Sequence, residues 1–368
     1  MTDARAGGGD FASALYLGMR HPWAALGPWD ALTTGVPAVL DEPPGAERTA
    51  RRLARLQGLE AAVLVPSTLH LFHDLFALLR RDAGAVLVDA GAYAVGRDAA
   101  ARARIPARGF AHHDPRALRR ALGAMRGAGR PVVLCDGICP RCGRVAPLPA
   151  YLAALREAGG WLVVDDTQAL GIAGSRPGAA APYGRGGGGT PRWWGIDAPE
   201  LVVGASLAKA FGAPLAALSG AAGLVDRFRA GAAARVHSSP PSVAAVRAAA
   251  RALALNRARG DVLRGRLGER VARLRRLLAE AGVGTRGGPF PVQTVTGLAD
   301  PAAAHAALAA RGIRAVLRAA PAPRLTLLLR SDHGDDELAR VAGILAREAK
   351  PGERRPRCGT IRMHRTTA

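Results

Sequence analysis

The sequence predicts an α/β protein with a large doubly wound, mostly parallel sheet domain, followed by a smaller α+β domain at the C-terminus. Short runs rich in Val and Leu recur before residue 240, and they are apolar throughout rather than alternating. Such runs are typical of parallel strands that are buried on both faces. Amphipathic stretches separate them, and this alternation indicates helices packed on a sheet. After Pro240 the composition changes, and a long stretch rich in Ala and Arg follows.

Composition places the chain among globular proteins. Of its 368 residues 49% are hydrophobic and 22% are charged, which excludes wholesale disorder. Acidic and basic residues interrupt the first thirty positions, so no signal core forms there. The stretch from Ala210 to Val225 lacks charges but contains Gly and Pro and is too short to span a membrane. Four cysteines make no disulfide framework. We therefore expect a soluble cytoplasmic protein.

Six apolar runs are predicted as the strands of the large sheet. They are Ala61–Val65, Ala85–Asp89, Val132–Cys135, Trp161–Asp165, Leu201–Gly204 and the weaker Leu215–Ser219. Helices are predicted between them at Glu47–Gln57, Leu69–Arg81, Pro115–Arg126 and Pro149–Ala158. In doubly wound sheets ligands bind beyond the carboxyl ends of the strands. The residues that directly follow each run are therefore the candidates for a functional site.

The C-terminal part is predicted as a smaller domain. A long helix is expected over Ser242–Ala281, with a break near Gly260. The remaining elements are the strands Val292–Thr296, Arg314–Leu317 and Leu325–Leu329 and the helices Pro301–Arg311 and Asp335–Ala349. We expect an N-terminal segment at 1–32, the large domain at 33–240, the small domain at 241–349 and a disordered basic tail at 350–368. The run Gly186–Gly189 is expected to form a flexible loop.

A lysine follows the apolar run Leu201–Gly204. The chain has 51 basic residues, but only Lys209 and Lys350 are lysines. A lysine in apolar surroundings at a strand end is costly unless it is neutralised or bonded. Its amine can form a Schiff base, whereas an arginine cannot. Lys209 is therefore predicted as a covalent catalyst, and the alternative is a solvated lysine at a strand end.

Two adjacent acids end the run Trp161–Asp165. Strand geometry directs only one of Asp165 and Asp166 into a cleft. A carboxylate there can hold the protonated nitrogen of a pyridine ring and keep that ring an electron sink. The alternative is a helix N-cap, for which Asp166 and Thr167 are both suited.

Together, these two segments resemble the fold type I pyridoxal phosphate (PLP) enzymes, most closely the α-oxoamine synthases, which include 8-amino-7-oxononanoate synthases. The lysine segment is similar to that family's Thr/Ser-x-x-Lys-x-Phe-Gly, and the acidic segment to its Val-Asp-Asp-Ala-His-x-x-Gly. The matching positions are Val164, Asp165, Asp166, Gly171, Ser206, Lys209, Phe211 and Gly212. Weaker similarities extend from about Tyr16 to His333 and include Tyr16-Leu-Gly18 and the strand that begins at Arg324. The resemblance implies a PLP-dependent transferase fold of the aspartate aminotransferase type.

The resemblance also implies roles in catalysis. Lys209 would form the internal aldimine with PLP and later act as the base at Cα, and Asp165 would hold the pyridinium nitrogen. Arg324 would bind the substrate carboxylate through a bidentate pair. Gln168 stands where the family has a histidine that contacts the phenolic oxygen of the cofactor. An amide can bond that oxygen but cannot take a proton.

Further residues are predicted to hold the cofactor. Ser67 and Thr68 open the helix at Leu69, where free N–H groups suit a phosphate, although plain helix capping explains them equally well. Ser206 would add a phosphate contact, and Ser239 or its neighbour Ser238 would reach the phosphate of a partner subunit, since the family is homodimeric. Tyr93 stands where the family places an aromatic ring on the pyridine, and ordinary packing is its alternative.

We therefore expect a transferase, of the acyltransferase type, that condenses an amino acid with an acyl-CoA. Ala14, where the family has a substrate-contacting asparagine, and the missing Gly-Ser-rich loop at Thr33–Glu47 weaken the assignment of substrate. They leave an aminotransferase or an amino-acid lyase as an alternative. A second alternative is a non-catalytic, arginine-rich relative that binds nucleic acid. The formal charge of +22 is compatible with nucleic-acid binding. It is equally compatible with steering of an anionic substrate or with codon bias.

The remaining candidate is a cysteine cluster. Cys135, Cys139 and Cys142 lie close together, and Cys139-Pro-Arg-Cys-Gly143 is similar to one half of a zinc knuckle. Tetrahedral zinc takes four ligands and there is no second Cys-x-x-Cys, so no metal site is assigned. A redox pair and a structural role stay open. His112 and His113 show no ligand spacing and are expected at the surface.

Overall fold

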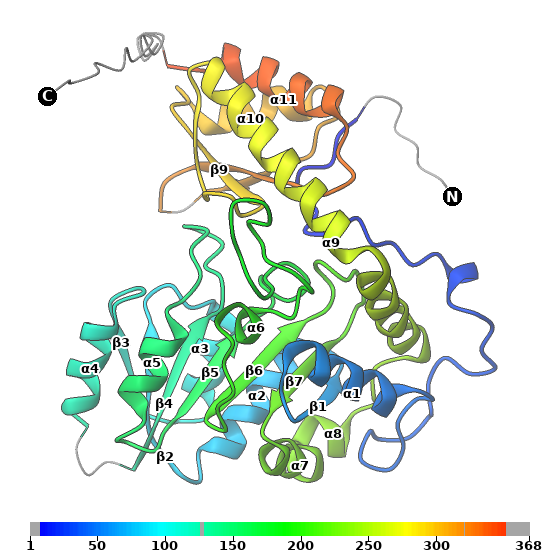
Figure 1. Cartoon of the computed structure of the whole chain (residues 1–368), viewed down its shortest axis with the longest axis vertical. Coiled ribbons are helices and arrows are strands. Elements are labelled where there is room, and N and C mark those ends of the chain that lie inside the picture. Colours follow the sequence, from blue (N-terminus) through cyan, green and yellow to red (C-terminus); the bar gives the residue numbers. More distant parts are fainter. Residues whose placement is uncertain (1–7, 126–128, 320, 351–368) are drawn as a thin grey trace, which may run out of the picture.

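The computed structural model describes residues 8–125, 129–319 and 321–350. A large sheet with its helices forms one body, a small sheet with its helices forms the other, and the helix α9 (Val243–Glu280) runs from one to the other (Figure 1). The predicted basic tail falls on 350–368, and of these positions only Lys350 lies within the described residues. No helix in the described part of the chain is long and apolar enough to cross a membrane.

The large sheet has seven strands in the order β1-β7-β6-β5-β4-β2-β3. They are β1 (Ala61–Val65), β2 (Ala83–Asp89), β3 (Ala107–Phe110), β4 (Arg130–Asp136), β5 (Trp161–Asp165), β6 (Leu201–Ser206) and β7 (Ala216–Gly220). The strands from β3 to β6 are parallel, and β7 is antiparallel to both its neighbours, β1 and β6. The prediction of a mostly parallel α/β sheet is confirmed.

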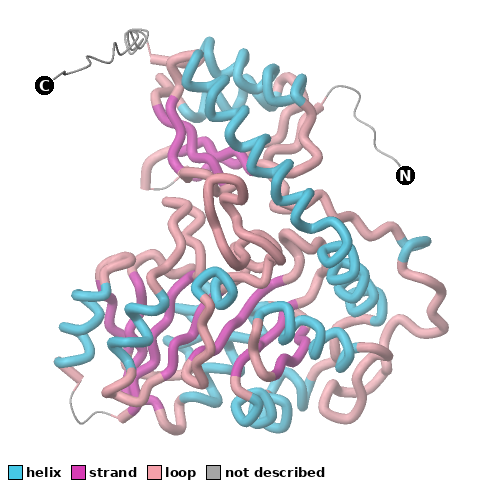
Figure 2. The backbone as a smooth tube through the Cα atoms, viewed as in Figure 1, coloured by secondary structure: helices cyan, strands magenta, loops and turns pink. Residues whose placement is uncertain are grey.

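Helices cover both faces of this sheet (Figure 2). They are α1 (Ala46–Gln57), α2 (Thr68–Leu79), α3 (Ala94–Arg102), α4 (Pro115–Gly123), α5 (Leu148–Leu155), α6 (Thr190–Trp194), α7 (Ala222–Gly231) and α8 (Ala233–His237). Successive strand residues contribute to different cores: Val132 packs with α2 and α3, whereas Val133 packs with α4 and α5. Burial on both faces explains why the strands are apolar throughout.

The small sheet is antiparallel, with the order β10-β11-β9-β8. Its elements are β8 (Gly284–Arg286), β9 (Val292–Thr296), β10 (Val316–Arg318), β11 (Arg324–Leu328), α10 (Pro301–Ala309) and α11 (Asp335–Arg347). The predicted break near Gly260 is wrong, because α9 continues through it for 38 residues. Gly260 is buried there, and a Cβ at this position would overlap the side chains of Asn256 and Arg264. The glycine serves close packing rather than a turn.

The glycine run before α6 is a loop, but one that is tied to α9. Gly186 N–H donates to Asp261 Oδ1 at 2.9 Å, and Asn256 Nδ2 donates to Gly186 O at 2.8 Å. The buried Arg264 donates to Gly171 O at 2.8 Å and pairs with Asp261. These bonds hold the segment that we expected to be flexible.

The N-terminal segment links the two bodies. Phe11 N–H donates to Arg314 O, and Leu328 N–H donates to Phe11 O, each at 2.8 Å, so residues 10–11 lie against the small sheet. Farther along, His21 Nε2 lies 2.7 Å from Phe211 O in the large body. The first part of the chain is thus fixed to elements from the last part.

Candidate active site

A cavity of about 870 Å³ separates the carboxyl edge of the large sheet from the small sheet. The large body contributes Lys209, Gln168 and His112 to its wall, and the N-terminal segment contributes Tyr16. The opposite wall is made by β9, β10 and β11. This is the edge at which ligands bind in doubly wound sheets.

Lys209 lies in the turn that follows β6 and lines this cavity. Its side chain is half-buried, and Gly212 N–H bonds to its carbonyl oxygen to close the turn. Burial lowers the pKa of the Lys209 amine, and the charge of Asp165 partly opposes this shift. An amine with a lowered pKa is a better nucleophile and base near neutral pH. The position therefore favours covalent catalysis over the solvated-lysine alternative.

The two acids at the end of β5 have different surroundings. Asp166 accepts hydrogen bonds from the Thr190 hydroxyl at 2.6 Å and the Thr190 N–H at 3.0 Å, so it fixes the start of α6. Asp165 is buried and accepts a bond from Thr167 N–H at 3.1 Å. Burial raises the pKa of Asp165, although the bonds from Thr167 and the charge of Lys209 oppose the rise. No ion pair among the described residues includes Asp165, so this carboxylate suits a cationic ligand group.

A third acid, Asp136, ends β4 and pairs in register with Asp165. It is buried and accepts a hydrogen bond from Tyr93 N–H at 2.9 Å. Burial, together with the charge of Asp165, raises the pKa of Asp136 to about 8. Two neighbouring buried carboxyl groups cannot both ionise cheaply. A protonated ring nitrogen would relieve that repulsion. Asp136 was not among the residues predicted from the sequence. The one sequence feature that could have identified it is its position at the end of a strand.

Tyr16 fixes the orientation of Gln168. The buried Tyr16 hydroxyl donates to Gln168 Oε1 at 2.7 Å, and both residues line the cavity. Because the amide oxygen is occupied, the amide NH₂ is the group left to donate toward a ligand. This agrees with a hydrogen-bonding role for Gln168. The sequence motif Tyr16-Leu-Gly18 does not predict this contact, because Tyr16 and Gln168 lie 152 positions apart in the chain.

The hydroxyl residues predicted to bind phosphate lie at two strand ends and one loop. Ser67 caps α2, where its Oγ accepts from His70 N–H at 3.4 Å, and Thr68 is the first helical residue, so capping and anion binding both remain open. Ser206 ends β6, and its Oγ accepts from Ala208 N–H at 3.2 Å. Ser239 is exposed in the loop before α9 and does not line this cavity, while the carbonyl oxygen of Ser238 accepts a hydrogen bond from Ala38 N–H at 3.0 Å.

The two histidines are not at the surface as expected. They follow β3, an edge strand whose polar Ala-Arg-Gly-Phe sequence gave no strand signal. His113 is 8% exposed, and burial lowers its pKa to about 4. His112 lines the cavity, whereas the side chain of Tyr93 is 59% exposed and does not. The stacking role of Tyr93 therefore stays a prediction.

Four arginines surround the cavity. Arg318 and Arg324 face each other in register on β10 and β11, and Arg141 and Arg286 lie in the walls beside the cysteines and β9. All four are exposed. Arg324 was predicted to bind a substrate carboxylate, and its position in the cavity wall suits that role. A ring of exposed guanidinium groups attracts anionic substrates.

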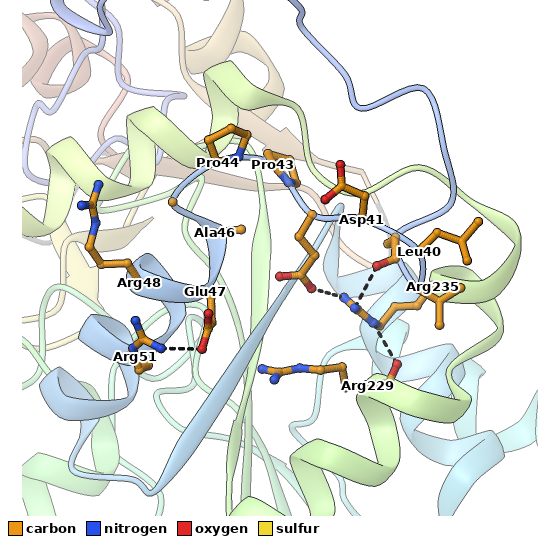
Figure 3. A pocket seen from close by; sticks show the side chains of 14 residues that line it. Leu40, Asp41, Pro43, Pro44, Ala46, Glu47, Arg48, Arg51, Arg229 and Arg235 are labelled. Carbon is orange, nitrogen blue, oxygen red and sulfur yellow. Dashed lines mark hydrogen bonds and ion pairs between the residues drawn. The ribbon is translucent and has the colours of Figure 1, made fainter.

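A second pocket, of about 730 Å³, lies between the segment before α1 and the helices α7 and α8. Arg235, which is labelled in Figure 3, lines this pocket and pairs with Glu42 at 2.6 Å. Arg235 also donates to Ala38 O at 3.0 Å, so it holds the segment that lacks the expected Gly-Ser-rich loop. None of the residues predicted for catalysis lines this pocket.

Comparison with known proteins identifies the family. Residues 41–330 match the family described as aminotransferase class I and II. The chain belongs to this family. It is 30% identical over 308 residues to an 8-amino-7-oxononanoate synthase from Geobacter sulfurreducens, an alignment that covers 81% of this chain and 76% of that protein. A protein of the same name from Sodalis glossinidius is 33% identical over 74% of this chain and 69% of its own length.

Solved structures agree on the fold. The serine palmitoyltransferase from Sphingomonas wittichii superposes with a TM-score of 0.79 at 19% identity, over 92% of this chain and 86% of that one. The 8-amino-7-oxononanoate synthase from Francisella tularensis gives a TM-score of 0.72 at 15% identity, over 92% and 97%. The predicted resemblance to fold type I PLP enzymes of the α-oxoamine synthase type is confirmed, as is the fold class.

The residues of the site fit PLP. A desolvated amine (Lys209), a buried carboxylate without an ion-pair partner among the described residues (Asp165) and a free amide NH₂ (Gln168) lie at one sheet edge. The start of α2 at the same edge offers N–H groups to a phosphate. These are an attachment point, a ring-nitrogen partner and hydrogen-bond donors for an aldehyde cofactor with a pyridine ring.

Proposed function

We propose that the protein is a PLP-dependent acyltransferase that condenses an amino acid with an acyl-CoA. The observation that carries this proposal is the cavity that Lys209 lines together with four arginines, with Asp165 buried at the same edge of the sheet. The relatives named 8-amino-7-oxononanoate synthase favour condensation over the aminotransferase and lyase alternatives. Nothing in the comparisons supports the nucleic-acid-binding alternative.

Each residue then has a definite task. PLP, when bound, supplies an electron sink for negative charge at the amino acid's α-carbon. Lys209 attaches the cofactor and afterwards carries the proton to and from that carbon, which its lowered pKa favours. Asp165 holds the proton on the ring nitrogen. Gln168 donates its amide NH₂ to the cofactor, and Arg324 binds the amino-acid carboxylate.

The finer assignments also belong to this proposal. We expect a homodimer, with Ser239 of one subunit reaching the phosphate in the other, because Ser239 is exposed and lies outside its own chain's cavity. We also expect a cytoplasmic location and a large domain that ends at residue 240. Size-exclusion chromatography with light scattering tests the dimer.

The reaction is tested by product detection. The purified protein, loaded with PLP, is given a panel of amino acids and acyl-CoA thioesters, and release of free CoA thiol is measured. Thiol release that requires both substrates supports condensation. In a parallel assay with a 2-oxo acid as amino acceptor, transfer of the amino group to that acceptor without thiol release would instead establish an aminotransferase. Lys209→Ala should abolish activity, and borohydride reduction should attach the cofactor to the peptide that contains Lys209 in the wild type alone.

A further inference from the structure

The segment Cys139–Gly143 forms a tight turn that carries two cysteines. Ile138 and Val145 form an antiparallel bridge, and Cys139 N–H donates to Arg144 O at 3.1 Å. Gly143 N–H donates to Cys139 O at 2.8 Å, with Gly143 at a φ of +70°. This backbone brings Cys139 and Cys142 to the same side of the turn. The turn alone supplies two ligands, which is why the sequence assigned no metal site.

His112, in the loop that follows β3, lies beside the two cysteines. One of its ring nitrogens and the two sulfur atoms lie within 4.8 Å of one another. His112 Nε2 is 3.5 Å from Cys142 Sγ. With Zn–S about 2.3 Å and Zn–N about 2.0 Å, a tetrahedral site places sulfur and nitrogen donors roughly 3.5 Å apart. The separation between His112 Nε2 and Cys142 Sγ matches this value, and the third donor, Cys139 Sγ, lies within 4.8 Å of both residues' donor atoms.

A buried carboxylate orients the histidine. Asp89 Oδ1 lies 2.6 Å from His112 Nδ1, and Asp89 also accepts bonds from Gly91 N–H, His113 N–H and the Tyr151 hydroxyl. At this distance His112 can donate its Nδ1 proton to Asp89, which leaves the lone pair of Nε2 free to face the cysteines. Metal-bound histidines typically have such a carboxylate partner.

We propose that His112, Cys139 and Cys142 bind one zinc ion, with Asp89 as the positioning residue. All three ligands line the same cavity as Lys209, so the fourth coordination position is reached from that cavity. Zinc sites with three protein ligands keep this position open for water or substrate. The site goes beyond the proposed acyl transfer and does not depend on it.

The position of the turn adds a consequence for the cavity. A Cβ at Gly143 would overlap Gly287 O, so the turn packs directly on the segment between β8 and β9. Arg141 donates to Ala90 O at 3.2 Å, which ties the turn to the end of β2. A zinc ion here would hold the turn in place between the large and small bodies.

The test is a metal assay on the holoenzyme. Untagged protein purified without chelators, or loaded with zinc and then desalted, should contain about one zinc per chain. X-ray absorption at the zinc edge should show two sulfur ligands and one histidine nitrogen. Cys142→Ser and His112→Gln should lose the metal while retaining the absorbance of bound PLP. Asp89→Asn should lower zinc affinity by roughly 10- to 100-fold.

Cys135→Ala is the matched control, because Cys135 lies on β4 in the same segment but outside the cluster, and this variant should retain zinc. Three results would overturn the proposal: a wild-type protein that holds no stoichiometric zinc after loading, a Cys142→Ser variant that keeps it, or a Cys139–Cys142 disulfide in the purified protein. The X-ray absorption spectrum of the wild-type protein identifies the zinc ligands even if a variant fails to fold.

Discussion

Asp136 and Asp165 lie side by side on neighbouring parallel strands, and both are buried. In the chain without cofactor, burial and the charge of Asp165 raise the pKa of Asp136 from its ordinary 3.8 to about 8. The folded protein thus keeps a proton that the unfolded chain releases. A site that holds two acids at this cost is prepared for a positively charged ligand group.

This arrangement predicts a pH dependence of stability for the cofactor-free protein. Because the folded pKa of Asp136 exceeds the unfolded one, its contribution is full below about pH 4 and is lost as pH rises through about pH 8. Asp136→Asn stays neutral and should reduce that loss by on the order of a few kcal/mol. Urea denaturation at a series of pH values measures the free energy of unfolding of both proteins. Asp98→Asn, on the exposed face of α3, should leave the slope unchanged.

Tyr16 provides a prediction about positioning. Tyr16→Phe removes the hydrogen bond that orients Gln168, so the amide can turn away from the cofactor. One such bond contributes about 1 kcal/mol, which corresponds to a several-fold fall in kcat. Tyr183→Phe is the control, because its hydroxyl donates to Pro289 O and the residue does not line the cavity. Equal kcat values for the two variants would contradict a role for Tyr16.

The sequence located the residues whose chemistry is unusual for their surroundings. Lys209 stood out because nearly every other cation is arginine, and Asp165 because it ends an apolar strand. His112 and Tyr16 could not be found in that way. His112 follows a strand with no apolar signal, and Tyr16 reaches Gln168 from 152 positions away in the chain. Their roles arise from tertiary contacts alone.

Among the elements, α9 is a case in which tertiary packing overrides the low helix propensity of a glycine, Gly260. Gly260→Ala should destabilise the protein by about 1–3 kcal/mol, because the new methyl group overlaps Asn256 and Arg264. Gly265→Ala in the same helix is exposed and meets open space, so it should stabilise by up to about 1 kcal/mol. Thermal or urea unfolding compares them. Similar effects from both substitutions would show that α9 is not tightly packed at Gly260.

Strand positions were predictable where burial is complete. The runs at β1 and β5 match the observed strands from end to end, because both faces are covered by helices. The antiparallel direction of β7 was not predictable, since an apolar run carries no sign of its orientation. The edge strands β3 and β8 were missed because their exposed faces are polar or lack large side chains.

For the molecule as a whole, part of the net charge of +22 comes from the arginines that line the cavity, where it can attract an anionic substrate. We expect kcat/KM for an acyl-CoA to fall as ionic strength rises, because screening weakens the attraction of an anionic substrate. Arg318→Gln and Arg324→Gln should each raise KM for an anionic substrate by roughly tenfold. Arg276→Gln, on the exposed side of α9, should not. An unchanged KM in both cavity variants would exclude them from substrate binding.

The contact between the first and last parts of the chain has a consequence for folding during synthesis. Asp10 and Phe11 pair with Arg314 and Leu328, which are translated roughly 300 residues later. At about 5–20 residues per second, the N-terminal segment waits for roughly 15–60 seconds before its partners exist. The large sheet can form in that interval, whereas the small sheet cannot be completed. The segment around Phe11 is therefore synthesised before its partners but reaches its place after them, and the cavity wall containing Tyr16 closes only after β11 has been translated.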